Sequence, residues 1–248
     1  MSKTQIIDAV QQLDVARTRR LLDSNPSLLA VTDRKGRNLL HLACSVPCGD
    51  LRIPESAATR MAGFLLRAGI GLESTKDDPK GGGTPLWFAV ARGRNATLVR
   101  FLLKRGAAPT RIPGGGLFAA GWYDDVHILN LLVRAGVAVD VGDDMTPFLA
   151  CWSWQRFRAA KFLALKGADV NRREPEKGKT ALHIGVEKAF DPALLAWLVK
   201  HGASPDIPDR QNATARQMAS RKRNKQWLAS LQSADARTES AVRDIKSR

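Results

Sequence analysis

The sequence predicts an all-helical chain in which one helix–turn–helix unit is repeated. Residues 83–109 form a complete unit, with two short amphipathic segments separated by breaks at Gly93 and Asn95. A closing glycine follows a Leu-rich, basic run at positions 69, 106, 136, 167 and 202, at intervals of 37, 30, 31 and 35 residues. Because neither helix of such a unit can bury its apolar side alone, neighbouring units must stack.

The start of the unit recurs as well. A capping side chain can accept hydrogen bonds from the free amides of the first turn, and proline fits the first helical position. The four starts are Asn38-Leu39-Leu40-His41, Thr84-Pro85-Leu86-Trp87, Thr146-Pro147-Phe148-Leu149 and Thr180-Ala181-Leu182-His183. Together with the ending Gly167-Ala168-Asp169-Val170-Asn171, they resemble the ankyrin repeat over roughly residues 3–231. The resemblance implies an all-α solenoid of stacked helix pairs with hairpin loops.

The periodicity sets the expected boundaries. Capping helices are expected in residues 1–32, a closing repeat in residues 208–231 and a basic tail in residues 232–248. The repeats between them are placed at residues 33–73, 74–109, 110–140, 141–171 and 172–207. The residues predicted to be buried are Leu86, Ala89, Leu102, Leu131, Leu163, Leu182 and Leu198.

Charge is the unusual feature of the composition. The chain has 39 Lys and Arg against 24 Asp and Glu, a formal charge of +15, which favours polyanionic partners such as DNA or an acidic protein. Residues 216–248 carry nine basic and three acidic residues, so the tail explains only part of the excess. Charges scattered over solvent-facing helices are the plainer explanation. No long apolar run or signal peptide is present, so we expect a cytoplasmic protein without a membrane span. We also expect a monomer without a cofactor.

An insertion rich in Pro, Gly and charge, residues 45–56, is predicted as a loop between two helices. His41, Cys44 and Cys48 lie near it, but three candidate ligands without a fourth do not make a structural zinc site. The resemblance implies instead that His41 bonds to loop backbone. No metal site is therefore predicted.

The next repeat departs most from the pattern. Three glycines, Gly114, Gly115 and Gly116, occupy the place of the helix-opening residues, at a cost of roughly 1 kcal/mol each relative to alanine in a helix. They would allow close backbone approach and expose amides to an anion. A degenerate repeat that its neighbours tolerate is the alternative.

Aromatic residues follow the glycines. Trp122 and Tyr123 are placed at the end of the first helix, and Trp154, Gln155 and Arg156 are placed at the equivalent positions of the next repeat. Trp152 stands where the ankyrin repeat usually has alanine. These rings are either anchors for a partner or bulk that fills space beside the glycines.

Three functions remain open at this stage. The ankyrin resemblance implies a protein-binding scaffold, in which aromatic and Arg anchors carry most of the binding energy. A basic groove with rings for stacking would instead bind nucleic acid, with DNA as the expected partner. The candidate binding residues are Trp87, Arg92, Arg94, Gly114, Gly115, Gly116, Trp122, Tyr123, Trp154, Arg156, Arg173 and Lys177.

The third function is a base-flipping DNA glycosylase. Trp122, Tyr123 and Trp154 would line the pocket, and Asp124 or Asp125 would be the catalytic carboxylate. The alternative for either aspartate is an N-cap of the second helix, because Asp is a preferred capping residue.

Overall fold

The computed structural model describes residues 2–75, 83–111, 113–142 and 145–232, and every regular element within these ranges is helical. The chain divides into two compact units, Met1–Ala138 and Val139–Arg248. The predicted all-α class is confirmed. The predicted tail lies outside the described residues beyond position 232.

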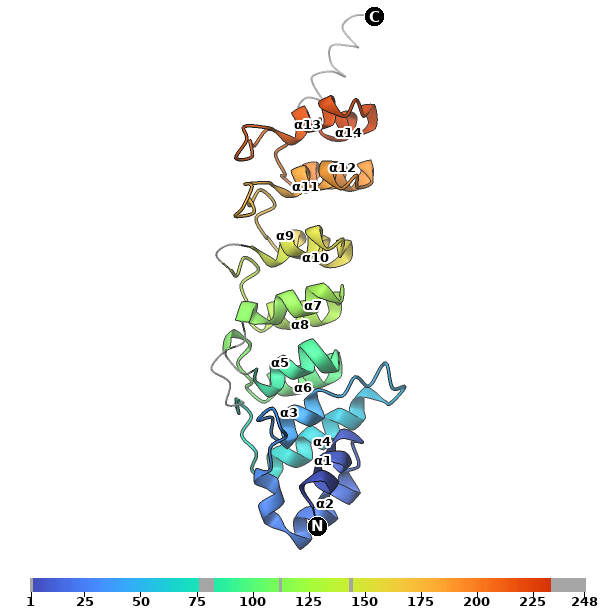
Figure 1. The fold of residues 1–248 in the computed structure, drawn as a ribbon, viewed down its shortest axis with the longest axis vertical. Coiled ribbons are helices and arrows are strands. Elements are labelled where there is room, and N and C mark those ends of the chain that lie inside the picture. Colours follow the sequence, from blue (N-terminus) through green and yellow to red (C-terminus); the bar gives the residue numbers. More distant parts are fainter. Residues whose placement is uncertain (1, 76–82, 112, 143–144, 233–248) are drawn as a thin grey trace, which may run out of the picture. The chain divides into compact units, whose positions relative to one another are not determined.

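Helix pairs make up each unit (Figure 1). The first unit contains α1 (Lys3–Gln11), α2 (Val15–Ser24), η1 (Pro26–Ala30), α3 (Leu39–Cys44), α4 (Glu55–Arg67), α5 (Pro85–Phe88), η2 (Ala89–Gly93), α6 (Ala96–Lys104), η3 (Pro109–Arg111), η4 (Pro113–Gly116), α7 (Leu117–Trp122) and α8 (Val126–Arg134). The second unit contains α9 (Pro147–Ser153), α10 (Phe157–Leu165), α11 (Ala181–Glu187), α12 (Pro192–Lys200), α13 (Ala215–Arg221) and α14 (Lys225–Ser230). Among the described helices, none has both the length and the apolar character that a membrane span requires.

The predicted capping residues begin the first helix of each pair. Thr84 Oγ1 accepts from the Trp87 amide at 3.3 Å, and Thr146 Oγ1 accepts from the Leu149 amide at the same distance. In both helices a proline follows the cap and occupies the first turn. Each cap satisfies an amide that the helix itself cannot pair, so the sequence sets these helix starts locally.

Two buried histidines join neighbouring repeats. His41 Nδ1 accepts from the Asn38 amide, which leaves Nε2 to donate to the Ser74 carbonyl oxygen at 2.9 Å. His183 Nε2 donates in the same way to the Ala213 carbonyl oxygen at 2.9 Å. The expectation that His41 bonds to loop backbone is confirmed, and a histidine held in this way is a structural tie between loops.

The core follows the predicted pattern with one error. All but one of the predicted core residues are buried, and the buried set is Leu86, Ala89, Leu102, Leu163, Leu182 and Leu198. Leu131 is half-buried, and its neighbour Leu132 is buried instead. The buried leucine lies four residues before the closing glycine in each of these repeats, so the prediction was wrong by one position.

The glycine run does not open an α-helix, contrary to the prediction. Residues 113–116 form the 3-10 turn η4, and α7 begins only at Leu117. Gly114 and Gly116 have φ of 60° and 79°, which L side chains rarely adopt. The glycines therefore allow the left-handed backbone conformation of the segment that leads into α7. Gly116 is the N-cap of α7 and provides no side-chain hydrogen bond there.

The turn between paired helices contains one left-handed residue in a regular position. Gln155, Ala189 and Arg223 have φ between 53° and 60°, and each lies nine residues after the capping threonine of its repeat. In the repeat that begins at Thr84, the left-handed residue is Arg94, ten residues after the cap. The π-helical turn η2 accommodates the extra residue, because each π turn takes up one residue more than an α turn.

Candidate functional site

The first unit presents a group of apolar and charged side chains in the loop after α3 and at the C-terminal ends of η2 and α7. We call it the turn-side surface and define it by Asp50, Leu51, Arg94, Trp122 and Tyr123. The exposed fraction is 55% for Leu51, 48% for Trp122 and 44% for Tyr123. Single exposed apolar side chains are common on protein surfaces, but a group of them can mark a contact surface.

Arg94 connects the parts of this surface. Its guanidinium forms an ion pair with Asp50 of the inserted loop and lies 5.0 Å from the centre of the Tyr123 ring. The Arg94 side chain is 33% exposed and that of Asp50 is 60% exposed. The displaced left-handed turn therefore places one cation between a loop and a ring that belong to the repeats on either side of it.

A hydrogen bond from Asn95 also attaches the end of the inserted loop to the turn that contains Arg94. Asn95 Nδ2 donates to the Glu55 carbonyl oxygen at 3.1 Å, while Asn95 Oδ1 caps α6 by accepting from the Leu98 amide at 2.8 Å. A Cβ added at Gly93 would lie 2.4 Å from the Cys44 carbonyl oxygen. Glycine at this position thus permits the close contact between the π turn and the end of α3.

The stretch of chain that contains the π turn and the rings has an excess of basic residues. Residues 83–134 contain seven Lys and Arg and two Asp, a net charge of +5. Arg92, which precedes Arg94 in the π turn, is exposed. An acidic partner would be attracted here, and the rings and Leu51 would give it apolar contact.

Comparison with known proteins agrees with this architecture. Residues 81–112 and 177–210 match the ankyrin repeat model. The solved ankyrin repeat domain of Bcl-3, a member of the IkappaB family, has a TM-score of 0.71 at 22% identity and covers 92% of this chain and 97% of its own. The ankyrin repeat domain of human ASB11 has a TM-score of 0.69 at 19% identity, with 91% and 95% coverage.

The chain is an ankyrin-repeat protein. Among relatives, it is 25% identical over 231 residues to a probable 26S proteasome regulatory subunit p28 of Saccharomyces cerevisiae, covering 88% of this chain and 94% of that protein. It is 29% identical over 161 residues to the nuclear factor NF-kappa-B p105 subunit of Gallus gallus, which covers 62% of this chain. The match spans only 16% of the p105 subunit.

The ankyrin frame gives Asp125 a defined structural contact. Its carboxylate accepts from the Ile128 amide at 2.9 Å and caps α8. Asp124 is the left-handed residue of the same turn, with φ of 55°. The cap is the alternative that the sequence left open, and a catalytic role for either aspartate stays a prediction.

Alignment of the ankyrin repeats on their left-handed turn residues changes which aromatic residues are equivalent. The left-handed residues Asp124 and Gln155 correspond, so Tyr123 is equivalent to Trp154 and not to Gln155. Arg156 is then equivalent to Asp125, and it stands at the N-cap of α10 without a side-chain cap bond. Trp154 and Arg156 are both half-buried and belong to the second unit.

Trp152 belongs to the core of the second ankyrin unit. Its side chain is fully buried, and its indole Nε1 donates to the Ala181 carbonyl oxygen at 2.7 Å. The ring packs edge-on against Phe157 and Phe190, with centroids 5.4 and 5.6 Å away. Filling of internal space therefore explains this tryptophan, as the sequence allowed for some of the rings.

Trp87 is half-buried, unlike Trp122. Its ring lies edge-on to Phe88 with centroids 5.0 Å apart, and a Cβ at Gly83 would lie 2.7 Å from it. Part of the apolar surface of Trp87 is thus already buried against other residues of the protein. Of the predicted binding residues, the turn-side surface brings together Arg94, Trp122 and Tyr123, and Trp87 is not among its defining residues.

Several basic residues of the hairpin loops have partners within the protein. The exposed Arg173 donates from Nη1 to the Pro208 carbonyl oxygen at 3.1 Å, and exposed Lys177 accepts through its carbonyl from the Arg210 amide at 2.8 Å. Burial alone would raise the pKa of Glu174, but hydrogen bonds from loop amides, including that of Lys177, hold it below its ordinary value. These loops therefore carry carboxylates that offset part of the positive charge.

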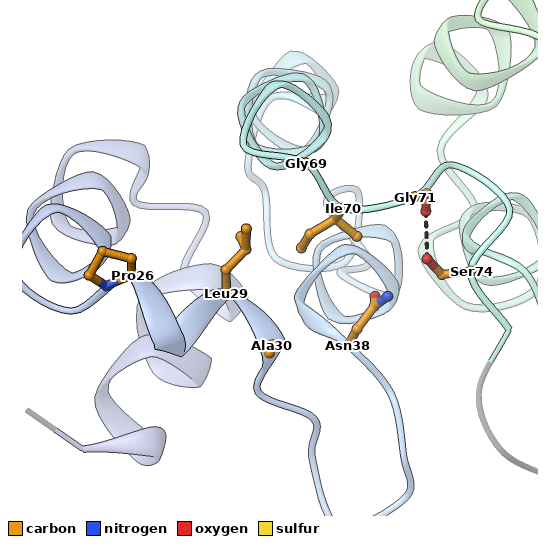
Figure 2. Close-up of a pocket in the computed structure, with 8 residues that line it drawn as sticks. All are labelled: Pro26, Leu29, Ala30, Asn38, Gly69, Ile70, Gly71 and Ser74. Atoms are coloured by element: carbon orange, nitrogen blue, oxygen red, sulfur yellow. Dashed lines mark hydrogen bonds between the residues drawn. The ribbon is translucent and has the colours of Figure 1, made fainter.

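An apolar hollow of about 500 Å³ lies elsewhere in the first unit, beside η1 (Figure 2). Leu29 and Ile70 face each other across it, and the other lining residues are Pro26, Ala30, Asn38, Gly69, Gly71 and Ser74. It contains none of the predicted site residues and no charged side chain. Among the described residues, no group of His, Cys, Asp and Glu is arranged to hold a metal ion.

Sequence reasoning missed Asp50 and Leu51. The inserted loop was recognised, but its Gly-Asp-Leu stretch gave no sign of a partner as distant in the chain as Arg94. An acidic residue followed by an exposed leucine in a loop that breaks the repeat was the available signal.

Proposed function

We propose that this ankyrin-repeat chain is a protein-interaction scaffold, and that the turn-side surface of its first unit is a principal contact site. The observation that carries the proposal is the exposed pair Trp122 and Tyr123, together with Arg94, which contacts the Tyr123 ring and pairs with Asp50, the residue before the exposed Leu51. Tryptophan, tyrosine and arginine are the residues that most often dominate binding energy at protein interfaces.

The relatives support a protein partner. The yeast relative, matched over 94% of its length, is named as a probable 26S proteasome regulatory subunit. The chicken relative is named as a subunit of nuclear factor NF-kappa-B, although only 16% of it is matched. Both names describe a subunit, which supports a protein partner for this chain.

Nucleic acid remains the second candidate because of the formal charge of +15. The site geometry favours it less. Rings that stack on bases serve best along a row of cations that follows a phosphate backbone. Here Arg94 contacts the Tyr123 ring, whereas Arg173 belongs to the second unit and bonds to a loop carbonyl. Base excision is a further proposal, and the contact of Asp125 with the Ile128 amide gives it no specific support.

Affinity enrichment with the full chain tests the protein proposal. Wild type, the double variant Trp122→Ser with Tyr123→Ser, and Leu165→Ser would each be immobilised and exposed to nuclease-treated lysate. Leu165 is 65% exposed in the second unit and is the matched control. We expect at least one protein to bind wild type and the control but to fall by about ten-fold or more with the double variant.

Loss of no protein from the double variant would contradict the proposed site. The nucleic-acid candidate has its own measurement, the affinity for duplex and single-stranded DNA as salt is raised. Replacing Arg92, Arg94, Arg156 and Arg173 together should lower the salt slope by about one unit per lost phosphate contact. Tight DNA binding that depends on Trp122 and Tyr123 would overturn the protein proposal.

A further inference from the structure

Exposed apolar side chains concentrate on the turn-side surface. Of the four large apolar side chains that stand out as exposed among the described residues, Leu51, Trp122 and Tyr123 belong to it and Leu165 does not. The ion pair and ring contact of Arg94 connect the loop that carries Leu51 to the helix end that carries the rings. The surface thus combines apolar contact with one central cation.

Arg94 can bind a carboxylate without leaving Tyr123. A guanidinium stacks through its flat face, while its N–H donors point outward in the plane and match the two oxygens of a carboxylate. In this structure the carboxylate in that place is Asp50, and Leu51 follows it directly. The inserted loop therefore presents to Arg94 an acidic residue with an adjoining aliphatic residue.

The contact with Asp50 is open to exchange. Asp50 is 60% exposed and Arg94 is 33% exposed, and ion pairs in such positions add little to stability. Asp50 lies outside residues 83–134 and offsets one of their five excess positive charges, so a net charge of +4 remains after this pair forms. An incoming acidic group is attracted while the internal one is weakly held.

We propose that the turn-side surface binds an acidic protein segment that places a carboxylate on Arg94, in exchange for Asp50, and an apolar side chain against Trp122 and Tyr123. The inference rests on the proposed protein-interaction function and names its partner class. Asp50 acts in it as an internal competitor. The segment needs both features, because carboxylates alone leave the rings exposed and an apolar segment alone leaves the positive charge unmatched.

Fluorescent peptides test the proposal with the full chain. The main probe is a short peptide with Leu and Phe three positions apart among Asp and Glu. One control peptide replaces Leu and Phe by Ser, a second replaces Asp and Glu by Asn and Gln, and an oligothymidylate supplies phosphate charge. We expect the main probe to bind about ten-fold or more tightly than each control, a difference that requires both kinds of contact.

Substitutions then assign the contacts. Arg94→Gln and Trp122→Ala should each weaken the main probe by about ten-fold, while Leu165→Ala should not change its affinity. Asp50→Asn should strengthen binding, because the competing carboxylate is removed and the ring contact is kept. Weaker binding by Asp50→Asn would overturn the exchange, and equal binding of the oligothymidylate would assign the surface to polyanions in general.

The outcome separates this inference from the broader function. In one outcome, the wild-type chain enriches a protein that the Trp122 and Tyr123 double variant loses, but the main peptide probe binds no better than its controls. The scaffold function then stands, and the acidic partner class is wrong. If neither experiment depends on the rings, the proposed site itself fails.

Discussion

The repeats that begin at Thr84 and Thr180 have the same spacing between the capping threonine and the closing glycine, Gly106 or Gly202, yet their turns differ. In the second, the left-handed residue is Ala189, nine residues after the cap, and in the first it is Arg94, ten residues after it. In the repeat at Thr84 the extra residue lies in the π turn, before the left-handed residue. In the repeat at Thr180 it lies after the left-handed residue. The same spacing therefore yields a regular turn and a π turn that points a cation toward its neighbours.

The helix ends are covered differently as well. In the second unit, Lys188 Nζ donates to the Ser153 carbonyl oxygen at 2.7 Å, and Lys222 Nζ donates to that of Val186 at 2.9 Å. These ammonium groups satisfy carbonyls at helix C-terminal ends, where positive charge is favourable. At the end of α7 in the first unit the rings of Trp122 and Tyr123 are exposed. Three of the four exposed large apolar side chains, Leu51, Trp122 and Tyr123, therefore lie in the irregular repeats.

The largest expected effect concerns Gly93. Gly93→Ala would bring a Cβ to 2.4 Å from a backbone oxygen of Cys44, which cannot move aside as a side chain can. We expect a loss of about 3 kcal/mol in the free energy of unfolding, at the upper end for overpacking. In the regular repeat, Gly185→Ala meets the flexible end of Leu195 and should cost about 1 kcal/mol.

Urea unfolding followed by circular dichroism measures both losses. Gly49→Ala is the control, because nothing lies within 4 Å of its added Cβ. Equal losses for Gly93→Ala and Gly185→Ala would mean that the close approach of the π turn to α3 has no special role.

Asn95 tests how the inserted loop is held. Asn95→Ala removes the cap of α6 together with the bond to Glu55, so the expected cost is about 2 to 3 kcal/mol. Asp191 caps α12 in the regular repeat by accepting from the Ala193 amide, so Asp191→Ala, which removes a cap alone, should cost about 1 kcal/mol. Thermal unfolding of the two variants gives the comparison, and a smaller loss for Asn95→Ala would contradict it.

The sequence predicted the parts of the fold that depend on local chemistry. The caps at Thr84 and Thr146 and the loop contact of His41 depend on residue type and spacing within a single repeat, or on the ankyrin resemblance. The π turn could not be predicted, because the spacing from cap to closing glycine is the same as in the repeat at Thr180. Whether the extra residue lies before or after the left-handed residue depends on packing, here on the contact of Gly93 with α3.

The candidate site could likewise be predicted only in part, because its assembly depends on tertiary packing. Arg94, Trp122 and Tyr123 were identified as binding residues by their chemistry, but their grouping with Asp50 depends on the fold. Trp152 shows the converse, since its burial depends on partners such as Phe190, which belongs to the following repeat. A ring's chemistry does not decide between core and surface; its tertiary neighbours do.

Stability should depend on pH through His41. Burial, its largest influence, holds the pKa of this imidazole below its ordinary value of 6.5. The unfolded chain therefore takes up a proton more readily, so stability is full above about pH 6.5 and falls as the pH drops, by at most about 1.4 kcal/mol per pH unit. His41→Gln should be less stable at neutral pH but should lose less between about pH 7 and pH 5.

Unfolding midpoints of wild type and His41→Gln across this range check the sign. Parallel pH profiles for the two proteins would contradict a neutral, buried His41, and so would a wild type that gains stability on acidification.

The smallest expected effect on stability is that of Arg94→Gln. It removes an exposed ion pair and a ring contact, and the cost should be within about 1 kcal/mol. Lys179→Gln is the matched change in the regular repeat, because it removes the ion pair with Glu187. Similar unfolding midpoints for the two variants are expected, and a loss above about 2 kcal/mol for Arg94→Gln alone would make it a structural residue.

The most direct test of the turn-side surface is the quenching of Trp122 fluorescence by iodide. The contribution of Trp122 is the difference between wild type and Trp122→Phe, measured with and without the acidic, apolar peptide probe. An exposed ring in a basic surface should be quenched strongly by this anion in the free protein and protected when the peptide is bound. Equal quenching of Trp122 in both states would contradict the account that the irregular repeats build a docking surface around this ring.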